Sequence, residues 1–169
     1  MMSRLALCFL CLLGACAPAD CFELPPVEST VPEKRCGESA ETYFSASAVE
    51  DLEALADCTI LVGRFQQDSV AQLQDFAPLQ NVWKIEGALN VFRSPGIVSL
   101  HGFENLQIVE GSLFIHQNEN LETIGALGKL RTVTQRLYIG GNRLLPQAQV
   151  DAFASRVTVC GSKDVAGNE

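Results

Sequence analysis

The sequence has few histidines and few basic residues. Of its 169 residues, two are His and 12 are Lys or Arg, against 20 Asp or Glu, which gives a formal net charge of −8. A surface that binds nucleic acid or an anionic membrane needs clustered positive charge, so this composition argues against both. Apolar runs of about 18 residues, the length that crosses a bilayer, are also missing. We therefore expect no transmembrane helix.

Motifs for catalysis or metal binding are scarce as well. Neither histidine, His101 or His116, belongs to a Ser-His-Asp order or a zinc-ligand spacing, and no phosphate-binding loop is present. The Gly140-Gly141-Asn142 segment is typical of a turn rather than of a nucleotide site. We expect no catalytic residue, no metal and no cofactor.

Cysteine, in contrast, is abundant, and the seven cysteines indicate an oxidising compartment. Residues 1–4 carry one positive charge and Leu5–Leu13 is apolar, a pattern typical of an export signal. The segment that ends at Cys16, Leu13-Gly14-Ala15-Cys16, resembles the lipobox of bacterial lipoproteins. The resemblance implies removal of residues 1–15 and acylation of Cys16. Cleavage after Ala17-Pro18-Ala19 is the alternative and would release a soluble protein.

An acylated Cys16 would attach the exported protein to a membrane that the chain does not cross. Ala17 stands where lipoproteins of the inner membrane usually carry Asp, so the resemblance favours the outer membrane or the cell surface. Residues 16–35 contain four prolines and four acidic residues and are expected to form an extended tether. Either cleavage leaves four cysteines in the exported part: Cys21, Cys36, Cys58 and Cys160.

Residues 36–58 are expected to form an N-terminal cap. Ser47 and Glu50 fit a capping box, and apolar residues at helical spacing predict one short helix from there to Cys58. A short strand is predicted at residues 42–44. A disulfide between Cys36 and Cys58 would close a loop around this helix.

The strongest pattern is a repeat of 24 residues over residues 59–145. Seven apolar columns recur at this period, for example Leu61, Ile85, Val109 and Val133, and the exceptions, Gln67 and Asp151, fall in the first and last repeats. A single repeat cannot bury its apolar residues, whereas stacked repeats can. We therefore predict a mainly β fold, a short right-handed β-helix or leucine-rich-repeat-like solenoid of about four 24-residue coils with short helical caps.

Within each repeat, the pattern Leu-x-Ile-x-x-Asn predicts a strand followed by a bend. Two copies are clear, Leu113 to Asn118 and Leu137 to Asn142, and a weaker copy begins at Leu89. The asparagine is expected to bond the backbone of the adjacent coil, and strands of neighbouring coils should pair in parallel.

These residues carry a resemblance. The Cys36-Gly37 start, the helix that ends at Cys58 and the repeated Ile-x-Gly-x-Leu-x-Ile units look like the receptor L domain, the β-helix-like module of the insulin and epidermal growth factor receptors. Similar single domains occur in bacterial lipoproteins. The resemblance covers residues 36–160 and implies a fold and a binding surface, but not hormone signalling, because the receptors' other domains are absent.

Residues 146–160 are expected to form the C-terminal cap, with a helix that Pro146 permits to start. Cys160 either pairs with Cys21 or remains a free thiol, and the sequence leaves both open. Residues 161–169 are predicted to be a flexible tail.

Two groups of side chains are candidate functional sites. Alternation along the strands places four rings on one outward face, Phe92, Phe114, His116 and Tyr138. They form a candidate binding face for a protein or a glycan, or a ladder that only stabilises the sheet. The second group is Glu86 and Glu110, whose stacking would raise the pKa of one of them and would suit glycoside chemistry or calcium, although solvated surface is the favoured interpretation.

The sequence thus predicts a lipid-anchored, extracytoplasmic, non-enzymatic binding module for a protein or carbohydrate partner. A structural protein of the cell envelope is the alternative, and a carbohydrate-active β-helix enzyme is a remote one.

Overall fold

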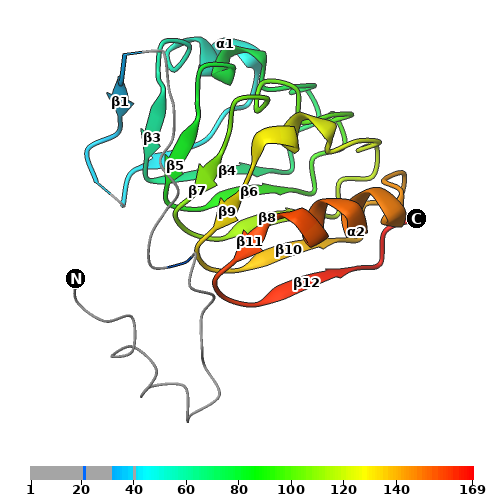
Figure 1. Cartoon of the computed structure of the whole chain (residues 1–169). Coiled ribbons are helices and arrows are strands. Elements are labelled where there is room, and N and C mark those ends of the chain that lie inside the picture. The colour runs from blue at the N-terminus through cyan, green and yellow to red at the C-terminus, as the bar shows by residue number, and fades with distance from the viewer. Residues whose placement is uncertain (1–20, 22–31, 40) are drawn as a thin grey trace, which may run out of the picture.

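The computed structural model describes residues 21, 32–39 and 41–169 (Figure 1). Its described part is mainly β, with two parallel six-stranded sheets and few helices, which confirms the predicted fold class at this level. Sheet A has the order β1 (Arg35–Cys36), β3 (Ile60–Val62), β5 (Lys84–Glu86), β7 (Ile108–Val109), β9 (Thr132–Val133) and β11 (Thr158–Val159). Sheet B has the order β2 (Tyr43–Phe44), β4 (Arg64–Asp68), β6 (Leu89–Phe92), β8 (Leu113–His116), β10 (Leu137–Gly140) and β12 (Lys163–Ala166).

Each 24-residue repeat contributes one strand to each sheet. In sheet B, Leu89 pairs with Leu113 and Leu113 with Leu137, so the register advances by one repeat per strand. The predicted parallel pairing of neighbouring repeats is confirmed. Figure 1 shows the strands stacked in chain order, with β1 and β12 at opposite ends of the stack.

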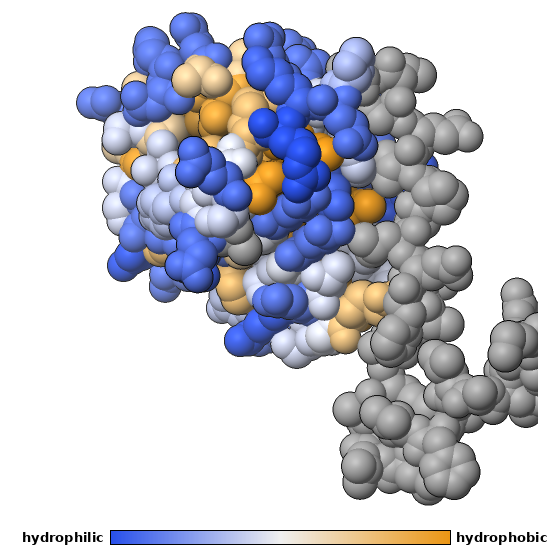
Figure 2. Space-filling view, turned by 90° about the vertical axis from the view of Figure 1, so that its left-hand side faces the viewer, coloured by the Kyte–Doolittle hydropathy of each residue, from blue (hydrophilic) through white to orange (hydrophobic). Residues whose placement is uncertain are grey.

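The core lies between the sheets and the connecting segments. The predicted inward columns are buried except in the last repeat, where Ala148 and Asp151 are exposed; Leu61, Ile85, Val109 and Val133 form one fully buried column. On the side of the molecule seen in Figure 2, hydrophilic side chains prevail and apolar ones form small patches between them. Gln67, the polar exception in the first repeat, is buried because its side chain bonds both backbone groups of Ala46. The open side of the first repeat is therefore covered by the N-terminal cap, which Gln67 contacts by hydrogen bonds.

The bends after β6 and β8 are held by a ladder of buried asparagines. Asn118 accepts a hydrogen bond from the backbone N–H of Ser94 at 3.1 Å and donates one to the carbonyl of Val91 at 3.0 Å. Asn142 repeats this arrangement one repeat later. The predicted role of the asparagines is confirmed, because each bonds the backbone of the preceding repeat.

The N-terminal cap differs in detail from its prediction. The predicted strand is present as β2, but helix α1 spans only Val49–Glu53 and gives way to turns before Cys58. The Ser47–Glu50 capping box is wrong: the Asp51 carboxylate accepts from the backbone N–H groups of Ser47 and Ala48, at 2.7 and 3.1 Å. A short carboxylate at the third helical position reaches back to these donors.

At the C-terminus, the predicted helix is present as α2 (Gln147–Arg156), but the predicted flexible tail is wrong. Lys163–Ala166 forms β12, which pairs with β10, and Asn168 extends the asparagine ladder by donating to the carbonyl of Ile139 at 3.2 Å. The chain therefore continues the repeat to its last residues.

Among the described residues, two disulfides fasten the two ends of sheet A. Cys36–Cys58 is present as predicted, and Cys21–Cys160 decides the open question for Cys160. Cys36 belongs to β1 at one edge of the sheet, whereas Cys160 follows β11 at the other. The second bridge joins residues 139 positions apart and so closes a loop around almost the whole described chain.

Candidate binding face

The structure brings the four predicted rings together on the outer side of sheet B. Strand register places Phe114 beside Tyr138 and Phe92 beside His116. The ring centroids of Phe92 and His116 lie 5.0 Å apart with parallel planes, and those of Phe114 and Tyr138 lie 6.3 Å apart. All four side chains are partly buried. We call these four residues the aromatic face.

A glycine allows the two columns of rings to merge. Gly140 follows His116 in register and has no side chain, and Tyr138 leans toward this position. A methyl group on Gly140 would lie 3.2 Å from the Tyr138 hydroxyl. Because no side chain occupies position 140, the Tyr138 ring can approach His116, and their centroids lie 5.4 Å apart. The rings thus form one connected row rather than two separate pairs.

Two arginines flank this row, and sequence reasoning did not identify them. The guanidinium of Arg93 lies 5.1 Å from the centroid of the Phe92 ring, and that of Arg136 lies 5.5 Å from the Tyr138 ring. These distances suit cation–π contacts. Phe92 therefore packs between Arg93 and the parallel ring of His116. The signal available in the sequence was a basic residue directly after an outward-facing ring, for Arg93, and one two positions before such a ring, for Arg136.

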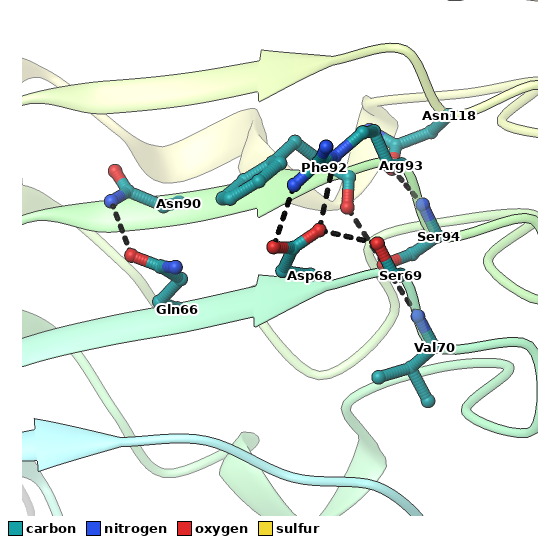
Figure 3. Close-up of polar contacts among 9 residues, drawn as sticks. All are labelled: Gln66, Asp68, Ser69, Val70, Asn90, Phe92, Arg93, Ser94 and Asn118. Carbon is teal, nitrogen blue, oxygen red and sulfur yellow. Dashed lines mark hydrogen bonds and ion pairs between the residues drawn. The ribbon is translucent and has the colours of Figure 1, made fainter.

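Polar side chains continue the face onto β4 (Figure 3). Arg93 donates to both oxygens of Asp68, at 3.1 and 2.8 Å, and Asn90 donates to Gln66 at 3.4 Å. Asn90 is only 8% exposed, and its Oδ1 has no hydrogen-bond partner among the described residues. The structure thus leaves a buried acceptor beside the rings without a hydrogen bond.

The electrostatics of the face are set by burial and by this ion pair. A hydrogen bond from the Ser69 hydroxyl, followed by those from Arg93, lowers the pKa of Asp68, so the carboxylate is ionised at neutral pH. Burial lowers the pKa of His116, and the nearby Arg93 lowers it further. The imidazole in the ring row is therefore uncharged at neutral pH.

A shallow cavity of about 480 Å³ adjoins the row where the strands of sheet B end. It is lined by Arg93, Pro95, Gln117, Glu119 and Gly141. Arg93 lines the cavity and packs on Phe92 of the aromatic face, so the two surfaces adjoin.

The second predicted group, Glu86 and Glu110, is neutralised. Lys84 lies between them, with its Nζ 3.0 Å from Glu86 and 2.8 Å from Glu110. The hydrogen bond from Arg35 is the main cause that lowers the pKa of Glu86, and Lys84 adds to it. For Glu86 the predicted rise in pKa is therefore wrong, because two cations outweigh the repulsion between the carboxylates. The pair is a surface ion network.

The other predicted residues lie away from the aromatic face or outside the residues that the structure describes. His101 pairs with Glu104 at 2.7 Å, and that hydrogen bond raises its pKa. Cys16, the predicted acylation site, lies outside the described residues. Among those described, no three His, Cys, Asp or Glu side chains are placed to share a metal ion. Within the same part of the chain, no helix is long and apolar enough to span a bilayer.

Comparison with known proteins gives one family. The model of the Receptor L domain matches residues 57–154, which include the whole aromatic face and the cavity. No curated protein matches the chain.

Proposed function

The chain belongs to the Receptor L domain family, and we propose that it is a non-enzymatic module that binds a protein through the aromatic face. The family consists of non-enzymatic binding domains, and its members bind protein ligands. The observation that carries the proposal is the connected row of Phe92, His116 and Tyr138 on the outer side of sheet B. Aromatic side chains supply large contact areas with little loss of conformational entropy, and arginine is enriched beside them at interfaces.

The ring packing favours a protein over a glycan. A sugar stacks on the open face of an aromatic ring, whereas Phe92 has His116 against it at 5.0 Å and Arg93 at 5.1 Å. The row therefore offers ring edges and guanidinium groups. Apolar and aromatic side chains of a protein pack against ring edges in the T-shaped arrangement that such pairs prefer.

The experiment uses two defined probes on the full chain: a phage-displayed library of random 12-residue peptides and a printed glycan array. We expect the library to yield peptides that bind saturably, and their affinity to fall at least tenfold when Phe92, Phe114 and Tyr138 are replaced together by serine. Val98→Ser is the matched control, because Val98 is an exposed apolar residue outside the face.

Three outcomes would contradict the proposal. Peptides that bind the triple variant and the wild type equally would show that the face is not the contact surface. A library that yields no saturable peptide would count against a peptide-binding module. Saturable binding on the glycan array that depends on the three rings would show that the partner is a glycan and not a protein.

We also propose a finer description of the fold. Each repeat gives one strand to each sheet, and this order supports a short right-handed β-helix-like solenoid of four 24-residue repeats with caps. In such a solenoid the outer side of sheet B is a continuous lateral surface, which suits a contact with an extended partner.

The proposal also places the module on a bacterial membrane surface, outside the cytoplasm, through acylated Cys16. The lipobox-like segment supports this, and the two disulfides suit an oxidising compartment. Expression in a Gram-negative bacterium fed with labelled palmitate tests it. We expect label on the wild type and on Cys11→Ser but not on Cys16→Ser. A labelled Cys16→Ser or an unlabelled wild type would contradict the anchor.

A further inference from the structure

One backbone position recurs in the left-handed region after each strand of sheet B from β4 to β12. Its members are Ser69 (φ 58°), Arg93 (φ 48°), Gln117 (φ 56°), Gly141 (φ 68°) and Gly167 (φ 77°). Glycine adopts this conformation freely, whereas residues with a Cβ are strained in it. The chain itself uses glycine at two of these five positions. Ser69, Arg93 and Gln117 thus stand at positions where glycine would adopt the backbone conformation without strain.

Both strained side chains line the cavity beside the aromatic face, together with Glu119. Ser69, at the same backbone position one repeat earlier, is not among the lining residues. The Nε and Nη2 groups of Arg93 donate to Asp68, and the guanidinium lies over the Phe92 ring. The Nη1 group of Arg93 has no hydrogen-bond partner among the described residues. The cavity wall thus holds two side chains on a strained backbone and a guanidinium donor without a partner, which makes it a candidate ligand site.

The lining groups define the chemistry of the occupant. Arginine only donates hydrogen bonds, ionised glutamate only accepts them, and the glutamine amide does both. Arg93 is already paired with Asp68, so its charge does not cancel that of Glu119, and the lining offers an occupant both donors and acceptors. An extended peptide main chain has this character, because carbonyl and N–H groups alternate along it.

We propose that this cavity binds the main chain of the protein partner, while the aromatic face takes its side chains. This inference rests on the proposed function and names the chemistry of one part of the same surface. Arg93 and Gln117 donate to main-chain carbonyl oxygens of the partner, and Glu119 accepts from a main-chain N–H.

The first test replaces the strained residues by glycine and measures affinity for a peptide selected on the wild type. We expect Gln117→Gly and Arg93→Gly each to weaken binding at least tenfold, and Gln117→Gly to melt at the same temperature as the wild type or higher. Val98→Ser is the control, because Val98 is exposed and lies outside both the aromatic face and the cavity lining. It should leave the affinity unchanged. Unchanged affinity in Gln117→Gly and Arg93→Gly would overturn the inference.

The second test methylates each backbone nitrogen of that peptide in turn. We expect one N-methyl group to weaken binding at least tenfold to the wild type but less than threefold to Glu119→Ala. An N-methyl series without effect, or an effect that persists in Glu119→Ala, would overturn the assignment.

The two proposals fail in distinguishable ways. If serine at Phe92, Phe114 and Tyr138 abolishes binding while glycine at 93 and 117 does not, only the cavity assignment is wrong. If the triple serine variant binds normally, the proposed function itself is wrong.

Discussion

The imidazole of His116 lies parallel to the ring of Phe92, with 5.0 Å between the centroids and 1° between the planes. The two residues are 24 positions apart in the sequence and paired in register on β6 and β8. Their stack joins two repeats on the outer side of sheet B, and it holds the imidazole in its uncharged form because burial lowers the pKa of His116.

The lowered pKa of His116 predicts a pH dependence of stability. The folded state holds the proton less tightly than the unfolded state, so protonation favours unfolding. The contribution of His116 is neutral above the unfolded pKa of about 6.5 and becomes destabilising as the pH falls through the lowered folded value. We expect the free energy of unfolding to fall more from pH 7.5 to pH 5 in the wild type than in His116→Phe, measured by urea denaturation.

His101 gives the control for this experiment, since its raised pKa has the opposite sign. His101→Asn should steepen the loss of stability on acidification. A wild type and a His116→Phe variant with equal slopes would contradict the assigned environment of His116.

Gly140 is predicted to keep the ring row connected. A Cβ there would lie 3.2 Å from the Tyr138 hydroxyl and 2.6 Å from the carbonyl of Ala166. We expect Gly140→Ala to lower stability by about 1–3 kcal/mol, as for other overpacked sites, and to weaken peptide binding although every ring remains. Gly128→Ala is the control, because nothing lies within 4 Å of its added Cβ. Equal melting temperatures of the two variants would exclude this role.

The asparagine ladder predicts a difference between two neighbouring asparagines. Asn118 is fully buried, and Asn118→Ala would leave the Ser94 N–H and the Val91 carbonyl without partners. We expect a loss of about 2–4 kcal/mol in urea denaturation. Asn120 is exposed and makes one hydrogen bond, to the carbonyl of Pro95, so Asn120→Ala should lose less than about 1 kcal/mol. Similar losses for both would show that the ladder does not stabilise the bends.

The terminal strand β12 is predicted to be part of the folded unit. Deletion of residues 162–169 would remove the strand that pairs with β10 and the bonds of Asn168 to Asn142 and Ile139. We expect a loss of at least about 2 kcal/mol, since buried groups lose their partners. The exposed Asp164 serves as control, and Asp164→Ala should stay within about 0.5 kcal/mol of the wild type. A deletion variant with the same free energy of unfolding as the wild type would show that residues 162–169 are a dispensable tail.

The exact period explains which features the sequence could predict. Because 24 residues separate Phe92 from His116 and Phe114 from Tyr138, alternation along one strand placed all four rings on one side of the sheet. The last repeat escaped detection because its spacing widens to 26 residues, as in Ile139 and Val165, and because Lys163 stands where the other repeats carry leucine or phenylalanine.

Contacts between columns could not be predicted in this way. The position of Lys84 between Glu86 and Glu110 depends on how a long side chain crosses from one strand to the next. The packing of Arg93 on Phe92 depends on a left-handed backbone that arginine rarely adopts. Periodicity identifies which residues share a face, whereas side-chain direction and backbone strain decide which of them meet.

Nuclear magnetic resonance of the ¹⁵N-labelled protein, titrated with a peptide selected from the library, tests the location of the binding surface most directly. We predict that the largest amide shift changes cluster at residues 90–93, 114–119 and 138–141, along the ends of β6, β8 and β10. Shift changes confined to sheet A, or spread without preference over the molecule, would contradict binding through the aromatic face.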